Sequence, residues 1–302
     1  MDKKINCVIL TVGTSLLNQY KDLDVFENKN YIEETLIRQV LIDKKFGAEI
    51  NSLNKLLKEH NNEFLNIYLL ASDTEMGKLC CSIIKNVIKI KYNIESVEIK
   101  IILELKNSDC RNFATKGLRN LVNEVTEIIK KYSPANVVML PIGGYKASIA
   151  LCSTIANVFG IDSYYMYEDF EDIVKIPALP IKLDYDAIVE EVDLFLKLKN
   201  SETIEMDKNI FSKIQTKNVF KSLLSYEKID NTKYLELTPL GLLFIERIEL
   251  DPNIVTLKKV TKEKSIKKDL QKNNKEKHAE AIFEDKQFKN LMKNILKKSI
   301  FK

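Results

Sequence analysis

The feature that most constrains the fold is an alternation, along the first 180 residues, of short apolar runs with longer runs of helical periodicity. The apolar runs are rich in β-branched residues and predict strands at residues 7–12, 66–70, 97–103, 136–140 and 162–167. Helical spacing of apolar residues predicts helices at residues 31–45, 53–59, 75–92, 112–132 and 147–159. This alternation predicts an α/β fold with a Rossmann-like, mostly parallel sheet and helices on both faces.

The alternation stops near residue 180, where Pro177 and Pro180 favour extended chain and indicate a linker. Beyond it the sequence predicts helices at 187–198 and 209–224, strands at 227–229 and 234–237 turned by Asp230 and Asn231, and a last helix capped by Thr238. We therefore expect a Rossmann-like domain at 1–180 and a smaller winged helix-turn-helix domain at 181–252. Residues 253–302, with fifteen lysines against six acidic residues, predict a basic tail with one strand and two amphipathic helices.

Composition excludes several kinds of site. The chain has 302 residues, of which 45% are hydrophobic and 30% charged, and no apolar run approaches the ~20 residues that span a bilayer, so we expect a cytoplasmic protein without a membrane partner. The five cysteines form no CxxC pair, which argues against a disulfide framework or a zinc site. Only two histidines are present, which leaves little room for a Ser-His-Asp triad. We expect neither a metal nor a cofactor.

Two glycine-bearing loops each follow a predicted strand, and their position at strand ends suggests that they share one site. The loop TVGTS follows the first strand, and the loop PIGGYKAS follows the fourth. Ligands of parallel sheets bind beyond the carboxyl ends of the strands, where glycines let backbone amides approach a phosphate. The alternative is that each loop is only a turn with a helix cap. We expect the two loops to form one cradle for an anion and a ribose, built from Thr11, Gly13, Thr14, Ser15, Gly143, Gly144, Tyr145, Lys146 and Ser148.

Two further strand ends carry polar residues that either bind a ligand or cap the next helix. In ASDTEMGK, Ser72, Asp73 and Thr74 could cap the next helix or face the same cleft, and capping is favoured; Ser72 is the candidate ligand contact among them. In ELKNSDCRNF, Asp109 is the expected cap, and Asn107 is the candidate ligand contact because an amide can hydrogen-bond the edge of an adenine. Neither glycine loop matches GxGxxG or GxxxxGK[ST], so binding of a dinucleotide or a nucleoside triphosphate is disfavoured.

The pairing of TVGTS with a later GGYK, ahead of a small helical region beyond a proline-broken linker, resembles the CRISPR-associated Rossmann-fold (CARF) proteins of type III CRISPR systems. The resemblance rests mainly on residues 1–180. It implies a homodimer whose loops surround one two-fold axis and bind a cyclic oligoadenylate, the second messenger of this antiviral defence, commonly the ring of four adenosines. By this resemblance, residues 13–15 form the first motif and residues 143–146 the second.

Some members of that family also cleave the ring slowly without a metal, by attack of a ribose 2′-hydroxyl on its neighbouring phosphate. The resemblance implies that Ser15 orients the attacking hydroxyl and that Lys146 stabilises the charge that develops on the phosphate. Binding alone and binding with cleavage both remain open at this point.

Two other functions also remain open. A ligand-responsive transcription regulator would read DNA through the winged helix, although residues 205–250 contain a single arginine. A CARF-gated ribonuclease would cut RNA through the tail. The R-x4–6-H motif of HEPN ribonucleases is absent, and residues 254–302 resemble only the first part of a RelE-type messenger-RNA interferase. The C-terminal region is therefore the candidate for contact with RNA or DNA.

Overall fold

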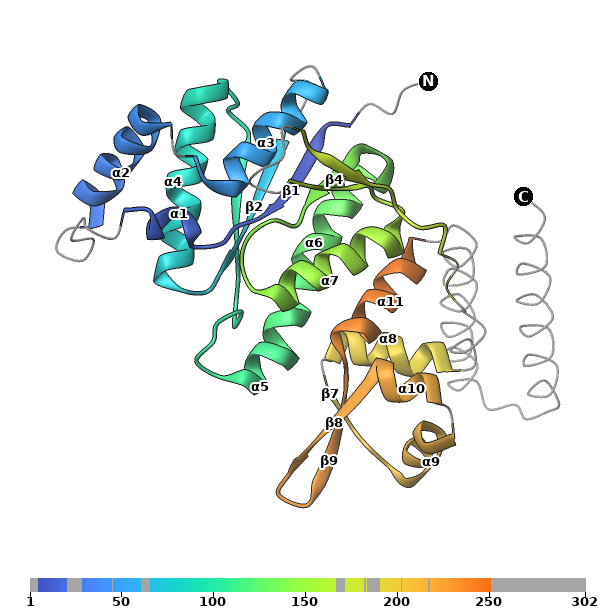
Figure 1. Ribbon diagram of the computed structural model, residues 1–302. Coiled ribbons are helices and arrows are strands. Elements are labelled where there is room, and N and C mark those ends of the chain that lie inside the picture. Colours follow the sequence, from blue (N-terminus) through green and yellow to red (C-terminus); the bar gives the residue numbers. More distant parts are fainter. Residues whose placement is uncertain are drawn as a thin grey trace, which may run out of the picture. The chain divides into compact units, whose positions relative to one another are not determined.

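The computed structural model describes residues 5–20, 29–44, 46–60, 66–166, 172–181, 183, 191–201, 203–216 and 218–250 (Figure 1). By compactness the chain divides into two units, Met1–Glu246 and Arg247–Lys302. The predicted basic tail at 253–302 lies outside the described residues, and the domain boundaries after residues 180 and 252 stay predictions. No helix in the described ranges is both long enough and apolar enough to cross a membrane.

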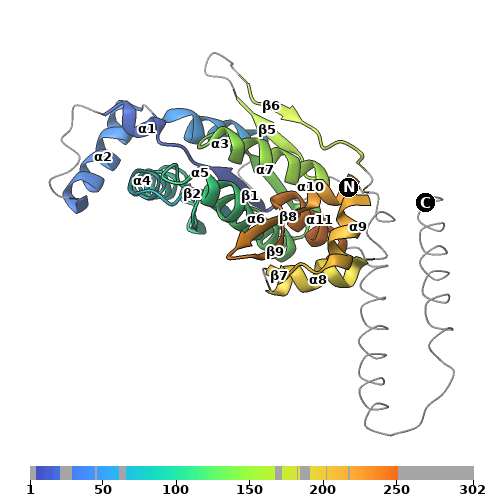
Figure 2. The ribbon, with the colours of Figure 1, turned by 90° about the horizontal axis from the view of Figure 1, so that it is seen from below.

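The first unit is built on a six-stranded sheet with the strand order β3-β2-β1-β4-β5-β6. The strands are β1 Cys7–Thr11, β2 Asn66–Ser72, β3 Val97–Ile102, β4 Val137–Leu140, β5 Ser163–Tyr165 and β6 Val174–Ile176. The first five run parallel, which confirms the predicted Rossmann-like α/β fold, and β6 pairs antiparallel with β5 at one edge (Figure 2). From β1 the chain adds strands on one side and then, from β4, on the other, so the strand order reverses between β1 and β4.

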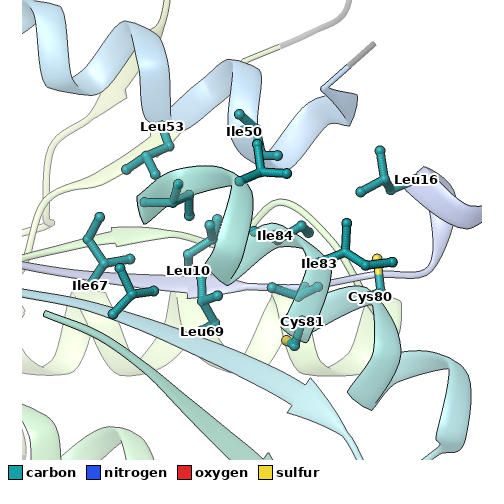
Figure 3. Close-up of a cluster of buried hydrophobic side chains, with 14 of the residues drawn as sticks. Leu10, Leu16, Ile50, Leu53, Ile67, Leu69, Cys80, Cys81, Ile83 and Ile84 are labelled. Atoms are coloured by element: carbon teal, nitrogen blue, oxygen red, sulfur yellow. The ribbon is translucent and has the colours of Figure 1, made fainter. Parts of the chain in front are cut away.

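Helices cover both faces of this sheet, as the buried strands require. They are α1 Ser15–Asn18, α2 Lys29–Asp43, α3 Gly47–Glu59, α4 Glu75–Tyr92, α5 Cys110–Asn112, α6 Leu118–Tyr132 and α7 Lys146–Phe159. Buried side chains of α3 and α4, such as Ile50 and Ile84, pack against Leu10 of β1 and Leu69 of β2 (Figure 3). Helices α6 and α7 lie side by side and contact the sheet through β3 and β4 (Figure 1). Right-handed crossovers between parallel strands explain which helices share a face. Helices α6 and α7 precede β4 and β5, which are added on the opposite side of β1 from β2 and β3, so these helices lie on the opposite face of the sheet from α3 and α4.

The residues after the sheet form a small antiparallel sheet with four helices. The strands, in the order β7-β9-β8, are β7 Thr203–Glu205, β8 Leu224–Ile229 and β9 Thr232–Leu237, and the helices are α8 Val192–Ser201, α9 Lys208–Thr216, α10 Asn218–Leu223 and α11 Pro239–Glu249. The predicted hairpin is confirmed, with Asp230 at φ 46° in its turn. The predicted cap is also confirmed, since the Gly241 N–H donates to Thr238 Oγ1 at 3.0 Å. The winged helix-turn-helix interpretation stays a prediction, and β7 was not predicted.

Ion pairs connect helix α6 to the small sheet and to α11. Glu246, only 3% exposed, accepts hydrogen bonds from Lys130 of α6 and, at 2.6 Å, from Lys199 of α8. Near the other end of α6, Arg119 pairs with Glu236 of β9 at 3.5 Å. Burying the Glu246 carboxylate costs free energy, and its two lysine partners offset that cost because each charge contacts an opposite charge.

Candidate ligand site at the carboxyl ends of β1 and β4

The two glycine loops meet at one edge of the sheet. Strands β1 and β4 are parallel neighbours, with Leu10 opposite Leu140, so the loops that follow them leave the sheet side by side. The Gly143 N–H donates to the carbonyl oxygen of Thr11 at 3.2 Å. A Cβ atom on Gly13 would lie 2.7 Å from the backbone nitrogen of Gly144, closer than real Cβ contacts allow. The predicted juxtaposition of the loops is therefore confirmed, and it needs glycine for close approach.

A buried carboxylic side chain, Glu49, lies between the two loops. Its Oε1 accepts a hydrogen bond from the Gly13 N–H at 2.9 Å, and a Cβ atom on Gly143 would lie 2.2 Å from the same oxygen. Glu49 is 1% exposed, and its Oε2 has no hydrogen-bond partner among the described residues. Sequence reasoning missed it because the predicted helix began at residue 53, whereas α3 begins at Gly47, whose φ is +69°.

These contacts change the roles expected for the glycine amides. The N–H groups of Gly13 and Gly143 are already used within the protein, by Glu49 and by the Thr11 carbonyl. Thr11 and Ser148 are each 4% exposed, and their buried hydroxyls have no partner within the described part of the chain. Buried hydroxyls normally make a hydrogen bond to protein, ordered water or ligand. These two buried hydroxyls therefore need a partner that the described residues do not supply, and an ordered water is the smallest that fits.

Both hydroxyls line a small pocket at this edge of the sheet. Its lining residues are Thr11, Val12, Leu70, Ser72, Ile102, Leu105, Leu121, Gly143, Gly144, Tyr145 and Ser148. The space that they enclose is about that of a single water molecule. A single chain therefore does not enclose a nucleotide here, and a ligand of that size would have to lie across the outside of the loops.

The start of helix α7 adds a ring and a cation to this edge. Tyr145 is the N-cap residue, and its ring meets that of Phe113 edge to face, with the centroids 5.1 Å apart. Phe113 opens a π-helical turn, Phe113–Gly117, between α5 and α6, and such turns are frequent at functional sites. Lys146 is exposed as the first residue of this 14-residue helix, whose N-terminus favours negative charge. Sequence reasoning did not find Phe113.

The remaining predicted contacts are only partly brought together. Thr14 and Ser15 are exposed at the start of α1, directly after Gly13. Ser72 lines the pocket, and its hydroxyl lies 3.0 Å from that of Thr74. Asn107 is exposed in the turn after β3 and is not among the residues that line the pocket.

At the other two strand ends, capping is confirmed for Thr74 and Asp109 but not for Asp73, which pairs with Lys78. Thr74 accepts a hydrogen bond from the Gly77 N–H at 3.0 Å, and Asp109 accepts from the backbone N–H of Arg111 at 2.9 Å. Asp73 lies 2.9 Å from Lys78, and this hydrogen bond holds the pKa of the Asp73 carboxyl below its usual value. The described ranges contain no group of three or more histidine, cysteine, aspartate or glutamate residues that could hold a metal ion.

Part of the chain is similar to a family of CRISPR-associated proteins. Residues 44–179 match the model of a family described as CRISPR-associated protein (Cas_APE2256). The matched residues include α3 with Glu49, strands β2 to β5 and the Gly143–Gly144 loop, whereas β1 and the Gly13 loop precede them. No curated protein matches the chain.

Proposed function

We propose that this chain binds a cyclic oligoadenylate, most simply the ring of four adenosines, across the loops that follow β1 and β4. The observation that carries the proposal is the meeting of the two glycine loops at the point where the strand order reverses. In open α/β sheets this is where ligands bind. The family match at residues 44–179 supports a CRISPR-associated role, in which such rings act as messengers.

The groups at this edge suit a ring of nucleotides. Lys146 and the N-terminus of α7 attract a phosphate, and the hydroxyls of the exposed residues Thr14 and Ser15 can hydrogen-bond a ribose or a base edge. The half-buried ring of Tyr145 keeps part of its surface open, and a base can stack on it. Because the pocket in one chain holds about one water molecule, we propose that a second copy completes the site around a two-fold axis.

The same edge supports a slow cleavage of the bound ring. In the proposed step a ribose 2′-hydroxyl gives up its proton to water as its oxygen attacks the adjacent phosphorus, the bond from phosphorus to the 5′-oxygen breaks, and that oxygen takes a proton from water, which leaves a 2′,3′-cyclic phosphate and a 5′-hydroxyl. Ser15 would orient the 2′-hydroxyl, and Lys146 would stabilise the negative charge that develops on the phosphate oxygens. Both side chains are exposed at the start of helices that follow the two loops.

Calorimetry with cyclic tetra-adenylate tests the binding. We expect saturation near one ring per two chains and an affinity at least tenfold lower for Lys146→Ala. Lys228→Ala, which removes an exposed lysine from β8, is the matched control and should bind as the wild type does. No heat of binding at tens of micromolar protein, or equal losses in the two variants, would reject the proposal.

Chromatography of the same mixture after long incubation without metal distinguishes cleavage from binding alone. Linear fragments that disappear in Ser15→Ala and Lys146→Ala would support cleavage. An unchanged ring, with binding retained, would make the protein a sensor of the messenger. An unchanged ring together with ligand-dependent loss of added RNA would instead favour a ribonuclease effector.

A further inference from the structure

We infer that Glu49 is a positioning residue, whose side chain fixes the spacing of the two glycine loops on which the ligand rests. The inference rests on the proposed function, because the ligand is the ring proposed above. It goes further by assigning a role to a residue of α3 that belongs to neither loop.

The contacts of Glu49 reach both loops at once. Its Oε1 accepts the hydrogen bond from the Gly13 N–H, and the same oxygen occupies the space where a side chain of Gly143 would begin. The next polar link between the loops is the bond from the Gly143 N–H to the Thr11 carbonyl. The first bond holds the Gly13 loop on α3, the second joins the two loops, and the buried Glu49 oxygen limits how closely Gly143 can approach.

The burial of Glu49 indicates that its side chain serves the geometry of the loops more than the stability of the fold. The neighbouring residues Ile50 and Leu53 of α3 are fully buried in the apolar core, and an apolar side chain at position 49 would avoid the cost of removing a carboxyl group from water. Glu49 has one oxygen bonded to Gly13 and one without a partner among the described residues. A buried carboxyl with only one of its oxygens bonded is a costly way to fill the core, so its bond to Gly13 points to a role in loop geometry.

The length of the side chain matters as much as its chemistry. Glutamine keeps an oxygen at the same distance from the backbone of α3, so it can still accept from the Gly13 N–H. Aspartate keeps the carboxyl but is one methylene shorter, so its oxygens cannot come within 2.9 Å of the Gly13 nitrogen unless the helix shifts. Leucine fills the volume but accepts no hydrogen bond.

Four variants in the full chain separate these properties: Glu49→Gln, Glu49→Asp, Glu49→Leu and, as a control, Ser52→Ala. Ser52 is a fully buried residue one turn along the same helix, and its hydroxyl has no partner in the described structure. Two readouts are used: affinity for cyclic tetra-adenylate, and hydrogen exchange of the amides in residues 11–17 and 141–148 without ligand. Thermal unfolding confirms that each variant is folded.

We expect Glu49→Leu and Glu49→Asp to bind the ring about tenfold or more weakly. Their Gly13 amide should exchange at least tenfold faster, because a factor of ten corresponds to about the free energy of one hydrogen bond. Glu49→Gln should stay within about threefold of the wild type, as should Ser52→Ala. If Glu49→Leu fails to fold, the contrast between Asp and Gln decides. Wild-type affinity and exchange in Glu49→Asp would overturn the inference, as would a folded Glu49→Gln as impaired as Glu49→Leu. If the wild type binds no ring, the proposed function fails, and the exchange measurement alone still tests whether Glu49 holds the loops.

Discussion

Replacing Gly143 by alanine should force the two loops apart. The added Cβ would lie 2.2 Å from Glu49 Oε1 and 2.3 Å from the Gly13 nitrogen, whereas ordinary contact begins at 3.4 Å. The nitrogen is backbone and cannot rotate away, so the loops must separate by about 1 Å. Overpacking of this kind costs about 1–3 kcal/mol, and loss of the bond between Gly13 and Glu49 adds about 1 kcal/mol. The expected loss of unfolding free energy is therefore about 2–4 kcal/mol.

Equilibrium unfolding in urea and calorimetry with cyclic tetra-adenylate measure the two consequences. Gly160→Ala is the matched control, because Gly160 ends α7 at φ +68° and no described atom lies within 4 Å of the position that an added Cβ would take. The control should lose about 1–2 kcal/mol through backbone strain and keep its affinity. Gly143→Ala should lose stability and also at least tenfold in affinity. A Gly143→Ala protein with wild-type stability and wild-type affinity would refute the reasoning about close approach.

Three further results are expected. Glu246→Ala should lower the unfolding free energy by about 2–3 kcal/mol in urea, because it leaves two partly buried lysines without their shared carboxylate, and an unchanged midpoint would contradict the ion-pair account. Because Lys78 lowers the folded-state pKa of Asp73, the stability that Asp73 contributes is present above its unfolded pKa of about 3.9 and is lost as pH falls through the folded value. The melting temperatures of wild type and Asp73→Asn should therefore differ at neutral pH and converge in strong acid. A difference that stays constant with pH would contradict the ion pair between Asp73 and Lys78. Iodoacetamide should label the exposed Cys110 and leave Cys80, whose pKa burial raises to about 12, so early labelling of Cys80 on mass spectrometry would contradict the packing of α4.

Much of the sheet could be predicted because its signals are local. Helix α4 was predicted with the bounds that the structure has, since Thr74 caps it, buried apolar residues recur at helical spacing and Asn93 ends it in the left-handed conformation. The five parallel strands were predicted to within two residues at each end because they are short runs rich in apolar, β-branched or aromatic residues, and β1, β2 and β4 are buried on both faces. Strand β6 was missed because its three residues are exposed and form no buried apolar run.

The candidate site could be predicted only where it consists of loops that follow strands. The pairing of Gly13 with Gly143 follows from strand order in a parallel sheet, which a sequence pattern can suggest. Glu49 could not be found in this way, because its role depends on a helix that begins at a glycine in the left-handed conformation and on a distance across 36 positions of the chain. Asn107 stays a prediction, since its amide is exposed after β3 and does not line this pocket.

A crystal structure of the protein with cyclic tetra-adenylate tests the central claim most directly. We expect the ring across the loops that follow β1 and β4, with phosphates near Lys146 and the N-terminus of α7 and with a second copy of the chain completing the site. A ring bound at another surface, with both glycine loops free of ligand, would contradict the account.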